Sequence, residues 1–550
     1  YKTPVVRIDF RKRLLERQVF FMELIKKQIH MNRWKGNAVT QITLDEDFIV
    51  PDTLEDMEQV ILEQAHIQGE NVKTQEEKIT VKGKLEFQVL YRKENGGLET
   101  LGGNIPFEET VNVPGLAEGD HTGLNWILED MKTDMINSRK LGVKAVITVE
   151  IHTEGETSQM AASDLKETGT AGSFSSQTEE MPPEVKMGSI SPVILALHRK
   201  DTYRIRENTV LTGGRPDIEN LLWKDISISS QSVKPLDGRL HLEGQLTLFV
   251  IYETEEENMP VQWMEEVIPF SGDIEIAQAH EGQIPMVSLR LAHGEVEAKP
   301  DPDGQMRELD LDVVLDLDIR LYEEKEEMLL KDIYSNSCQI TPEKNEMGYD
   351  RLIARNVCRP RIGEKIHLGQ QERILQICHT QGMVQLDEIE PEENSLDIEG
   401  ILDVTILYLT SDDSAPIQSV SRQIPFKCSA QAAGITKKSI YQLDAGVDQL
   451  TAVMTGADTV EVKGVAALDF MILEPVQETV ITGIKEEPLD LKQLQELPGI
   501  VGYIVQEKDS LWDIAKKFHT TVENIVTTNE LPGEQVKTGQ RLLLVKEVGV

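Results

Sequence analysis

Residues 79–91 read ITVKGKLEFQVLY, with an apolar side chain at every second position on either side of a glycine. The same pattern returns at residues 240–252, which read LHLEGQLTLFVIY, and at residues 396–408, which read LDIEGILDVTILY. A period of two is typical of a β-strand with one buried face, because successive side chains point to opposite faces of a sheet. The sequence therefore predicts three equivalent strands.

The far face of these strands, opposite the regularly apolar face, changes in polarity along their length. It is polar at first, but in the second and third copies it ends with the apolar residues Phe249, Ile251 and Leu407. We therefore expect each strand to run from a solvated side of its sheet to a covered one. The central glycine indicates a β-bulge or a close approach of another group to the backbone.

A second phrase, Ile-Pro-Phe, follows each strand after a polar turn, at residues 105–107, 268–270 and 424–426. Proline cannot donate a hydrogen bond to a central ladder, so we expect this phrase on an edge strand or at the start of a strand. Further alternating apolar runs lie downstream, at residues 143–151, 309–321 and 460–472. Each repeat is thus predicted to be mainly β.

Short helix-like stretches precede two of the strands, at residues 56–61 and 217–222, and a degenerate version stands at residues 373–377. The pair Asp237-Gly238 indicates a hairpin turn before the second copy. Copies so far apart in the chain are separate domains rather than units of a solenoid. The predicted fold class is a mainly β, multidomain chain with three sandwich-like repeats that carry short helices.

The domain boundaries follow from composition. Residues 154–188 are rich in Ser, Thr, Gly and Glu, and they are predicted to be a flexible linker because they bury too little apolar surface to fold. The junction near residues 334–360 has no such break, so the second and third repeats are expected to pack closely. The predicted division is a basic segment 1–36, repeats at 37–153, 189–336 and 337–484, linkers at 154–188 and 485–500, and a small module at 501–546.

The small C-terminal module is predicted to have the order βααβ. Alternating strands are expected at residues 503–505 and 542–544. Ser510 is predicted to cap the first helix, and Thr520 is predicted to form a capping box with Glu523 at the second.

This module resembles a LysM domain, a family that usually binds glycans containing N-acetylglucosamine, such as peptidoglycan. The resemblance implies a ligand or partner groove between the loop after the first strand and the loop before the last. Lys508 stands where the family has glycine, and its side chain is expected to crowd a glycan groove. The residues expected at the groove are Lys508, Asp509, Ser510, Leu511, Asn529, Leu531 and Pro532.

Taken together, the repeated strand, the Ile-Pro-Phe phrase, the opening MELIKK at residues 22–27 and the terminal module resemble the SipL family of clostridial spore-coat morphogenetic proteins. The repeats of that family are called SPOCS domains. The resemblance implies a non-enzymatic adaptor in the mother-cell cytoplasm, at the forespore surface, whose LysM module tethers the basement-layer ATPase of the coat. The alternative is a cell-wall or cortex protein that binds peptidoglycan, which Asp509, Ser510 and Asn529 favour.

Charge is unevenly distributed. Residues 1–36 carry ten Lys or Arg against three Asp or Glu, and residues 501–546 carry six of each sign, while the whole chain has a net charge of −39. The repeats are therefore strongly acidic. Such a body disfavours nucleic acid and anionic membranes as partners, because like charges repel, and solubility is the simplest role for the charge.

Three interpretations of the basic start remain open. Residues 10–22 are compatible with an interfacial amphipathic helix, with docking on the acidic repeats, or with an upstream extension of the gene model. We favour the last for residues 1–21, with Met22 as the true start. No signal peptide and no run long enough to span a bilayer is apparent in the sequence.

The sequence shows no recognisable chemistry of its own. The four cysteines include no Cys-x-x-Cys pair, and the eleven histidines show no metal-ligand spacing. Phosphate-binding loops and nucleophile elbows are also missing from the pattern. We therefore predict no catalytic, cofactor-binding or metal-binding residue, and no enzyme activity.

Overall fold

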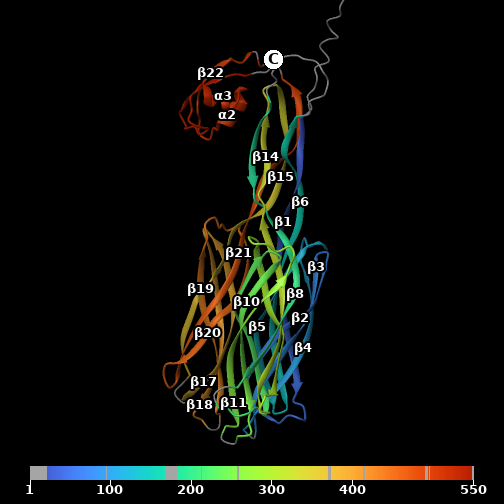
Figure 1. The fold of residues 1–550 in the computed structure, drawn as a ribbon, viewed down its shortest axis with the longest axis vertical. Helices are drawn as coiled ribbons and strands as arrows, with labels where there is room; N and C mark the ends of the chain where they lie inside the picture. Colours follow the sequence, from blue (N-terminus) through green and yellow to red (C-terminus); the bar gives the residue numbers. More distant parts are fainter. Residues whose placement is uncertain are drawn as a thin grey trace, which may run out of the picture.

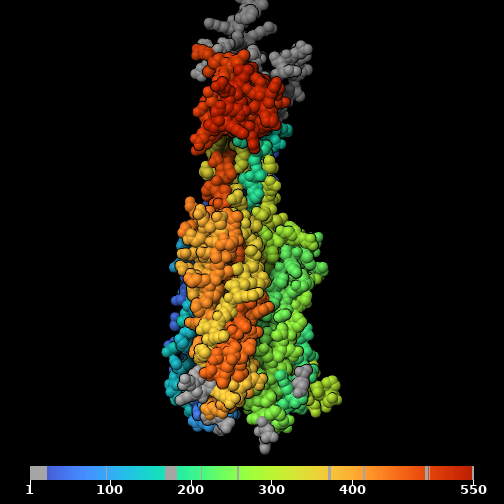
Figure 2. Space-filling view, turned by 90° about the vertical axis from the view of Figure 1, so that its left-hand side faces the viewer, coloured from blue at the N-terminus to red at the C-terminus, as the bar shows by residue number. Residues whose placement is uncertain are grey.

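The computed structural model describes residues 22–94, 96–167, 182–211, 214–256, 259–368, 373–412, 415–489, 494 and 496–547. The molecule is elongated, with a broad body, a narrower stalk and a small module at the far end of the stalk (Figure 1). Figure 2 shows the three repeats side by side in the body, with the C-terminal module as a cap.

The first repeat is a sandwich of two antiparallel sheets. One sheet has the order β1-β6-β5 and the other the order β2-β3-β4. Their apolar faces enclose a core that includes Val81, Leu85 and Val89. The strands are β1 (Met22–Ile49), β2 (Met57–Gln75), β3 (Lys78–Lys93), β4 (Leu98–Asn112), β5 (His121–Asn137) and β6 (Lys140–Glu167).

The second repeat has the same plan, with sheets β12-β13-β8 and β11-β10-β9. A two-stranded ribbon, β14-β7, extends it. The strands are β7 (Glu184–Ile190), β8 (Val193–Val210), β9 (Asn220–Leu236), β10 (Arg239–Glu253), β11 (Val261–Glu275), β12 (Ile284–Pro300), β13 (Met306–Glu324) and β14 (Glu327–Tyr334).

The third repeat again pairs two sheets. The sheet β17-β18-β19 faces a sheet in which β21 pairs with β15, β16 and β20. The strands are β15 (Cys338–Cys358), β16 (Arg361–His367), β17 (Ile374–Glu392), β18 (Ser395–Thr410), β19 (Ile417–Gln431), β20 (Ile440–Met454) and β21 (Thr459–Pro488). The predicted mainly β repeats are therefore confirmed.

The repeated strand is the middle strand of its sheet in each repeat, as β3, β10 and β18. The Ile-Pro-Phe phrase lies on the neighbouring edge strand, as predicted, and its phenylalanine stands opposite the central glycine. A Cβ atom on Gly244 would lie 2.5 Å from the Phe270 ring. A register shift also falls beside the glycine on its other side, between β9 and β10. Both readings of the glycine, a bulge and a close approach, are thus confirmed.

The predicted helix-like stretches are wrong. Residues 57–61 belong to β2, and residues 220–222 belong to β9. β-Bulges explain the misleading spacing: the β2–β3 register shifts between Met57 and Gln59 and again between Val60 and Leu62. Each extra residue breaks the period of two, so the apolar positions mimic a helical pattern.

The predicted linker at residues 154–188 is also wrong over much of its length. β6 continues to Glu167, paired with β1 down to Met22, and β7 covers residues 184–188. Partner strands satisfy the backbone of this polar segment, and its small residues Ala161 and Ala162 are buried. Residues 168–181 lie outside the described part, as do residues 1–21 with the predicted basic helix. The linker predicted at 485–500 likewise begins inside β21.

The stalk is made from the first and last strands of every repeat. The ribbons β1–β6, β7–β14 and β15–β21 lie along one another above the body (Figure 1). They share a buried cluster made of Ile29, Met31, Ala161, Ile190, Leu329, Met347, Tyr349 and Val480. The ribbons also share polar contacts, such as the Trp34 backbone N–H donating to Asp350 over 2.8 Å.

The three sandwiches meet in the body through a second apolar cluster. Phe249, Ile251 and Leu407 lie in it, as the far-face pattern predicted, and Leu90 supplies the equivalent contact from the first repeat. The other buried members are Ile61, Leu62, Leu98, Leu222, Trp223, Cys378 and Ile417. The covered ends of the repeated strands therefore face other repeats.

Candidate functional site

The C-terminal module has the predicted βααβ order. β22 (Ile500–Ile504) pairs with β23 (Arg541–Val545), and the helices α2 (Leu511–Phe518) and α3 (Val522–Thr528) lie between them. Ser510 caps α2 as predicted, because its side chain accepts from the Asp513 N–H. Thr521 caps α3, so the predicted capping box at Thr520 is wrong. Thr520 is instead fully buried at the corner between the helices.

The module docks on the stalk through α2. The indole Nε1 of Trp512 donates to Asp332 Oδ2 over 2.9 Å, and the Lys516 ammonium contacts both Asp332 oxygens at 2.8 Å. The Tyr334 hydroxyl donates to the Thr520 carbonyl over 3.0 Å, and its ring meets Trp512 edge-on at 4.9 Å. Tyr334 thus completes the apolar core of the module.

Electrostatics strengthen this contact. Burial alone would raise the pKa of Asp332, but the hydrogen bonds from Lys516 and Trp512 outweigh it and lower the pKa. The carboxylate is therefore charged when the module is docked. The sequence alone does not reveal this site: the spacing of Trp512 and Lys516 puts them on one helix face, but no pattern connects that face with Asp332.

Several predicted groove residues hold the module together. Asp509 accepts from the Tyr503 hydroxyl at 2.7 Å and from the Gln506 N–H at 2.8 Å. Asn529 accepts from the Leu543 N–H at 2.7 Å and donates to the Leu543 carbonyl at 2.8 Å. These bonds fix the two loops that border the predicted groove.

The other predicted groove residues differ in exposure. Lys508 is exposed and has a φ of 71°, a conformation that favours glycine. Pro532 is exposed, Leu531 packs partly against the module core, and Leu511 is buried in that core. The side chain of Leu511 therefore packs against the helices rather than pointing outward from its loop.

The outer face of the module sheet is apolar and exposed. Ile500, Ile504 and Leu543 are 64%, 53% and 47% exposed. In the antiparallel register Leu543 stands opposite Gly502, midway between the two isoleucines. We call these three residues the sheet face. They lie on the module away from the buried side that packs on α2 and α3.

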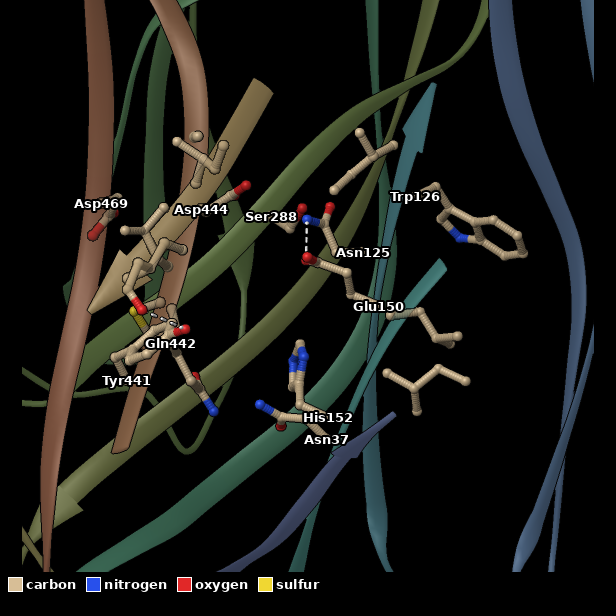
Figure 3. Close-up of a pocket in the computed structure, with 18 of the residues that line it drawn as sticks. Asn37, Asn125, Trp126, Glu150, His152, Ser288, Tyr441, Gln442, Asp444 and Asp469 are labelled. Carbon is tan, nitrogen blue, oxygen red and sulfur yellow. Dashed lines mark hydrogen bonds between the residues drawn. The ribbon is translucent and has the colours of Figure 1, made fainter. Parts of the chain in front are cut away.

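A cavity of about 430 Å³, lined by both polar and apolar residues, lies between the three sandwiches. Figure 3 shows Asn125, Glu150 and Ser288 on one side of it and Asp444 and Asp469 on another. The Arg290 guanidinium donates to Asn125 over 2.6 Å. Burial lowers the pKa of Arg290 and raises that of Asp444. Charges of both signs line the cavity, which suits water and small polar solutes.

His152 also lines this cavity and is neutral. Burial, with Arg320 beside it, lowers the pKa of His152 to about 3, so its Nε2 accepts from Arg320 Nη1 at 2.7 Å. Among the residues that the structure describes, no group of three or more His, Cys, Asp or Glu side chains is arranged to hold a metal ion.

Comparison with known families agrees with this architecture. A model of the SipL SPOCS domain matches residues 56–136, 217–299 and 373–455, and a model of the LysM domain matches residues 503–545. The chain is a SipL-like protein. It matches no curated protein and no solved structure.

Each SPOCS match covers four consecutive strands of a repeat, β2 to β5, β9 to β12 or β17 to β20, and leaves out the strands on either side of them. In the first repeat, for example, it runs from β2 to β5, so β1 and β6 lie outside it. The strands that build the stalk therefore lie outside the matched segments. SPOCS and LysM domains are non-catalytic binding domains, and together they suggest a sporulation-related binding scaffold.

The SPOCS domains are joined by a charged network in which His379 and Asp225 are buried and Glu265 is exposed. His379 of the third contacts Asp225 at 3.1 Å and Glu265 at 2.6 Å, both from the second. Its ring stacks on Phe249 at 4.0 Å. Gln64 of the first domain also donates to Asp225. Burial opposes protonation, but the two carboxylates outweigh it and raise the pKa of His379 to about 9.

In the described residues, no helix is long and apolar enough to cross a membrane.

Proposed function

We propose that this protein is a non-enzymatic scaffold in spore-coat assembly, which acts in the mother cell at the forespore surface. In this proposal the three SPOCS domains form an acidic, interlocked body, and the LysM module holds the basement-layer ATPase of the coat. Its family matches support a sporulation-related scaffold, and the ATPase is the partner that the SipL resemblance implies.

The exposed sheet face is the observation that carries the proposal. Three large apolar side chains on so small a module favour a protein partner, because exposed apolar clusters mark interaction sites. The groove supports the same conclusion. Asp509 and Asn529 are engaged within the module, and Lys508 occupies the position where a glycan-binding loop has glycine. We propose that the ATPase contacts the sheet face and the exposed groove residues Lys508 and Pro532.

Binding of peptidoglycan is the second candidate function. The LysM match favours it, because the family usually binds such glycans. In this case Lys508, Asp509, Ser510 and Asn529 would border a glycan groove, and the sheet face would have no role.

One pair of assays separates the two functions. The full-length protein is immobilised and tested for retention of the purified ATPase, and it is also sedimented with purified peptidoglycan. We expect Ile504→Asp to abolish ATPase retention, while Ile49→Asp, at a position that is 74% exposed on the body, leaves it unchanged. Saturable sedimentation with peptidoglycan, without ATPase retention, would overturn the proposal.

A further inference from the structure

Two of the four cysteines meet inside the third repeat. The Sγ atoms of Cys358 and Cys428 are 2.7 Å apart, and both thiols are free. Cys358 is the last residue of β15 and Cys428 lies in β19, so each sheet of the sandwich supplies one thiol. The other two cysteines lie elsewhere, because Cys338 packs in the stalk and Cys378 in the cluster between repeats.

The position of this pair in the fold is specific to the third repeat. Cys428 stands two residues after the phenylalanine of the Ile-Pro-Phe phrase, where the second repeat has Gly272. Tyr203 covers that glycine so closely that a Cβ atom there would lie 2.0 Å from its hydroxyl. An aromatic ring thus closes this edge of the second sandwich, whereas two thiols close it in the third.

The edge strand is also interrupted next to Cys358. β15 ends there, Arg359 and Pro360 follow, and pairing with β21 resumes in β16 at Arg361. In the first repeat the corresponding strand, β1, pairs with β6 over its full length. A bond from Cys358 to β19 would therefore tie down the interruption between β15 and β16.

We propose that Cys358 and Cys428 are an oxidation site, at which a hydroperoxide forms a reversible disulfide between the two sheets. Hydrogen peroxide oxidises the Cys358 sulfur to a sulfenic acid and is reduced to water. The Cys428 thiol then attacks that sulfur, and a second water leaves as the S–S bond forms. Overall, two thiols and one peroxide give one disulfide and two waters. An excess of dithiol restores both thiols by exchange.

The surroundings of the two thiols indicate which cysteine is oxidised first and which then attacks it. Burial, with Cys358 beside it, raises the pKa of Cys428 to about 12. Its thiol stays protonated at neutral pH, whereas the form of cysteine that attacks a peroxide oxygen is the thiolate. Cys358 is therefore the site of the first oxidation. A bonded pair has sulfurs about 2.05 Å apart, so closure needs only a small local shift.

Peptide mapping tests this proposal on the full-length protein. Trypsin places the four cysteines in four different peptides, at residues 332–344, 356–361, 374–422 and 428–437, because Arg359 precedes proline. After peroxide treatment we expect a cross-linked species of 356–361 with 428–437 that disappears with dithiothreitol. The double variant Cys338→Ser/Cys378→Ala, which keeps only the pair, is expected to give the same species.

A second measurement reports the consequence for the fold. The disulfide would join residues 70 positions apart and close a loop that contains β16, β17, β18 and most of β19. We expect oxidation to raise the thermal midpoint of the wild-type protein and not that of Cys428→Ser, each compared with its own reduced form. Peroxide treatment that yields only sulfinic or sulfonic acids at these positions, or links either cysteine to Cys338 or Cys378, would overturn the proposal.

Discussion

Trp512 of the LysM module donates its indole N–H to Asp332 at the tip of the stalk, over 2.9 Å. The module is thus fixed to the body by a charged and aromatic contact, in addition to its covalent connection. Its α2 helix is used for this contact, which leaves the sheet face on the opposite part of the module free for a partner.

Lys516 and its neighbour Lys517 give a matched test of this docking. Lys516 contacts Asp332, whereas Lys517 is exposed near Tyr503. We expect Lys516→Gln to speed hydrogen exchange in β14 and α2, with a loss of about 1–3 kcal/mol, and Lys517→Gln to leave exchange unchanged.

A cycle with Asp332→Asn completes that test. If the two groups act as a pair, the double variant Lys516→Gln/Asp332→Asn will be no weaker than either single variant. The pKa of Asp332 is lowered, so its contribution is full above the ordinary carboxyl pKa of about 4. It is lost as the pH falls below that value. Additive effects, or docking that persists in acid, would contradict the assigned contact.

His379 makes the contact between the second and third repeats dependent on pH. Its pKa is raised to about 9, so its stabilising effect is complete below its ordinary value near 6.5 and is lost as the pH rises through 9. We expect a loss of about 3 kcal/mol over that range, measured by denaturant unfolding at pH 6 and pH 10.

The variant His379→Gln should be destabilised at pH 6 and should differ little from wild type at pH 10. His241 is the matched control, because it also contacts two carboxylates but lies on the surface. His241→Gln is expected to leave the stability nearly unchanged at both pH values, because solvent screens an exposed pair. Equal slopes with pH for His379→Gln and wild type would rule out this role for the network.

Gly244 has no space for a side chain. We expect Gly244→Ala to destabilise the second repeat by about 1–3 kcal/mol, because the added Cβ meets the Phe270 ring. Gly119 has open space around it and serves as the control. Chemical denaturation measures both, and Phe270→Leu should partly rescue Gly244→Ala. Full stability of Gly244→Ala alone would show that the ring moves away at no cost.

Asn529 distinguishes a structural from a ligand-binding role for the predicted groove. It links the end of α3 to the backbone of Leu543 in β23. We expect Asn529→Ala to lower the unfolding free energy of the module by about 2 kcal/mol, measured by hydrogen exchange of β23. The exposed neighbour Glu530→Ala is the control. An unchanged module that loses a glycan ligand would instead assign Asn529 to binding.

The pattern of apolar residues along the sequence correctly predicted the central strand of each repeat. Strict alternation identified β3, β10 and β18, and the apolar far face at Phe249 and Leu407 correctly indicated a covered surface. In β2 and β9 the same alternation was not recognised, and a helix was predicted instead. The reason is that each β-bulge adds one residue and so shifts the period of two. Composition failed at residues 154–167, where a partner strand more than a hundred residues away supplies the hydrogen bonds.

Sites made by residues distant in sequence were the harder case. The groove residues are predicted from the module motif alone, but the docking site needs Asp332 and Trp512 together. The thiol pair needs Cys358 beside Cys428, and sequence spacing indicated no such pair. These contacts depend on which strands become neighbours, and nothing local specifies that choice.

Because of the stalk, the three repeats of this molecule are not independent units. Its cluster draws on β1, β6, β7, β14, β15 and β21 together, so the copies are bound to one another at both ends of the body. Gene duplication yields units that can at first be lost, gained or reordered. Once each copy contributes an indispensable pair of strands to a common shaft, that freedom ends, and the number three becomes a property of the architecture.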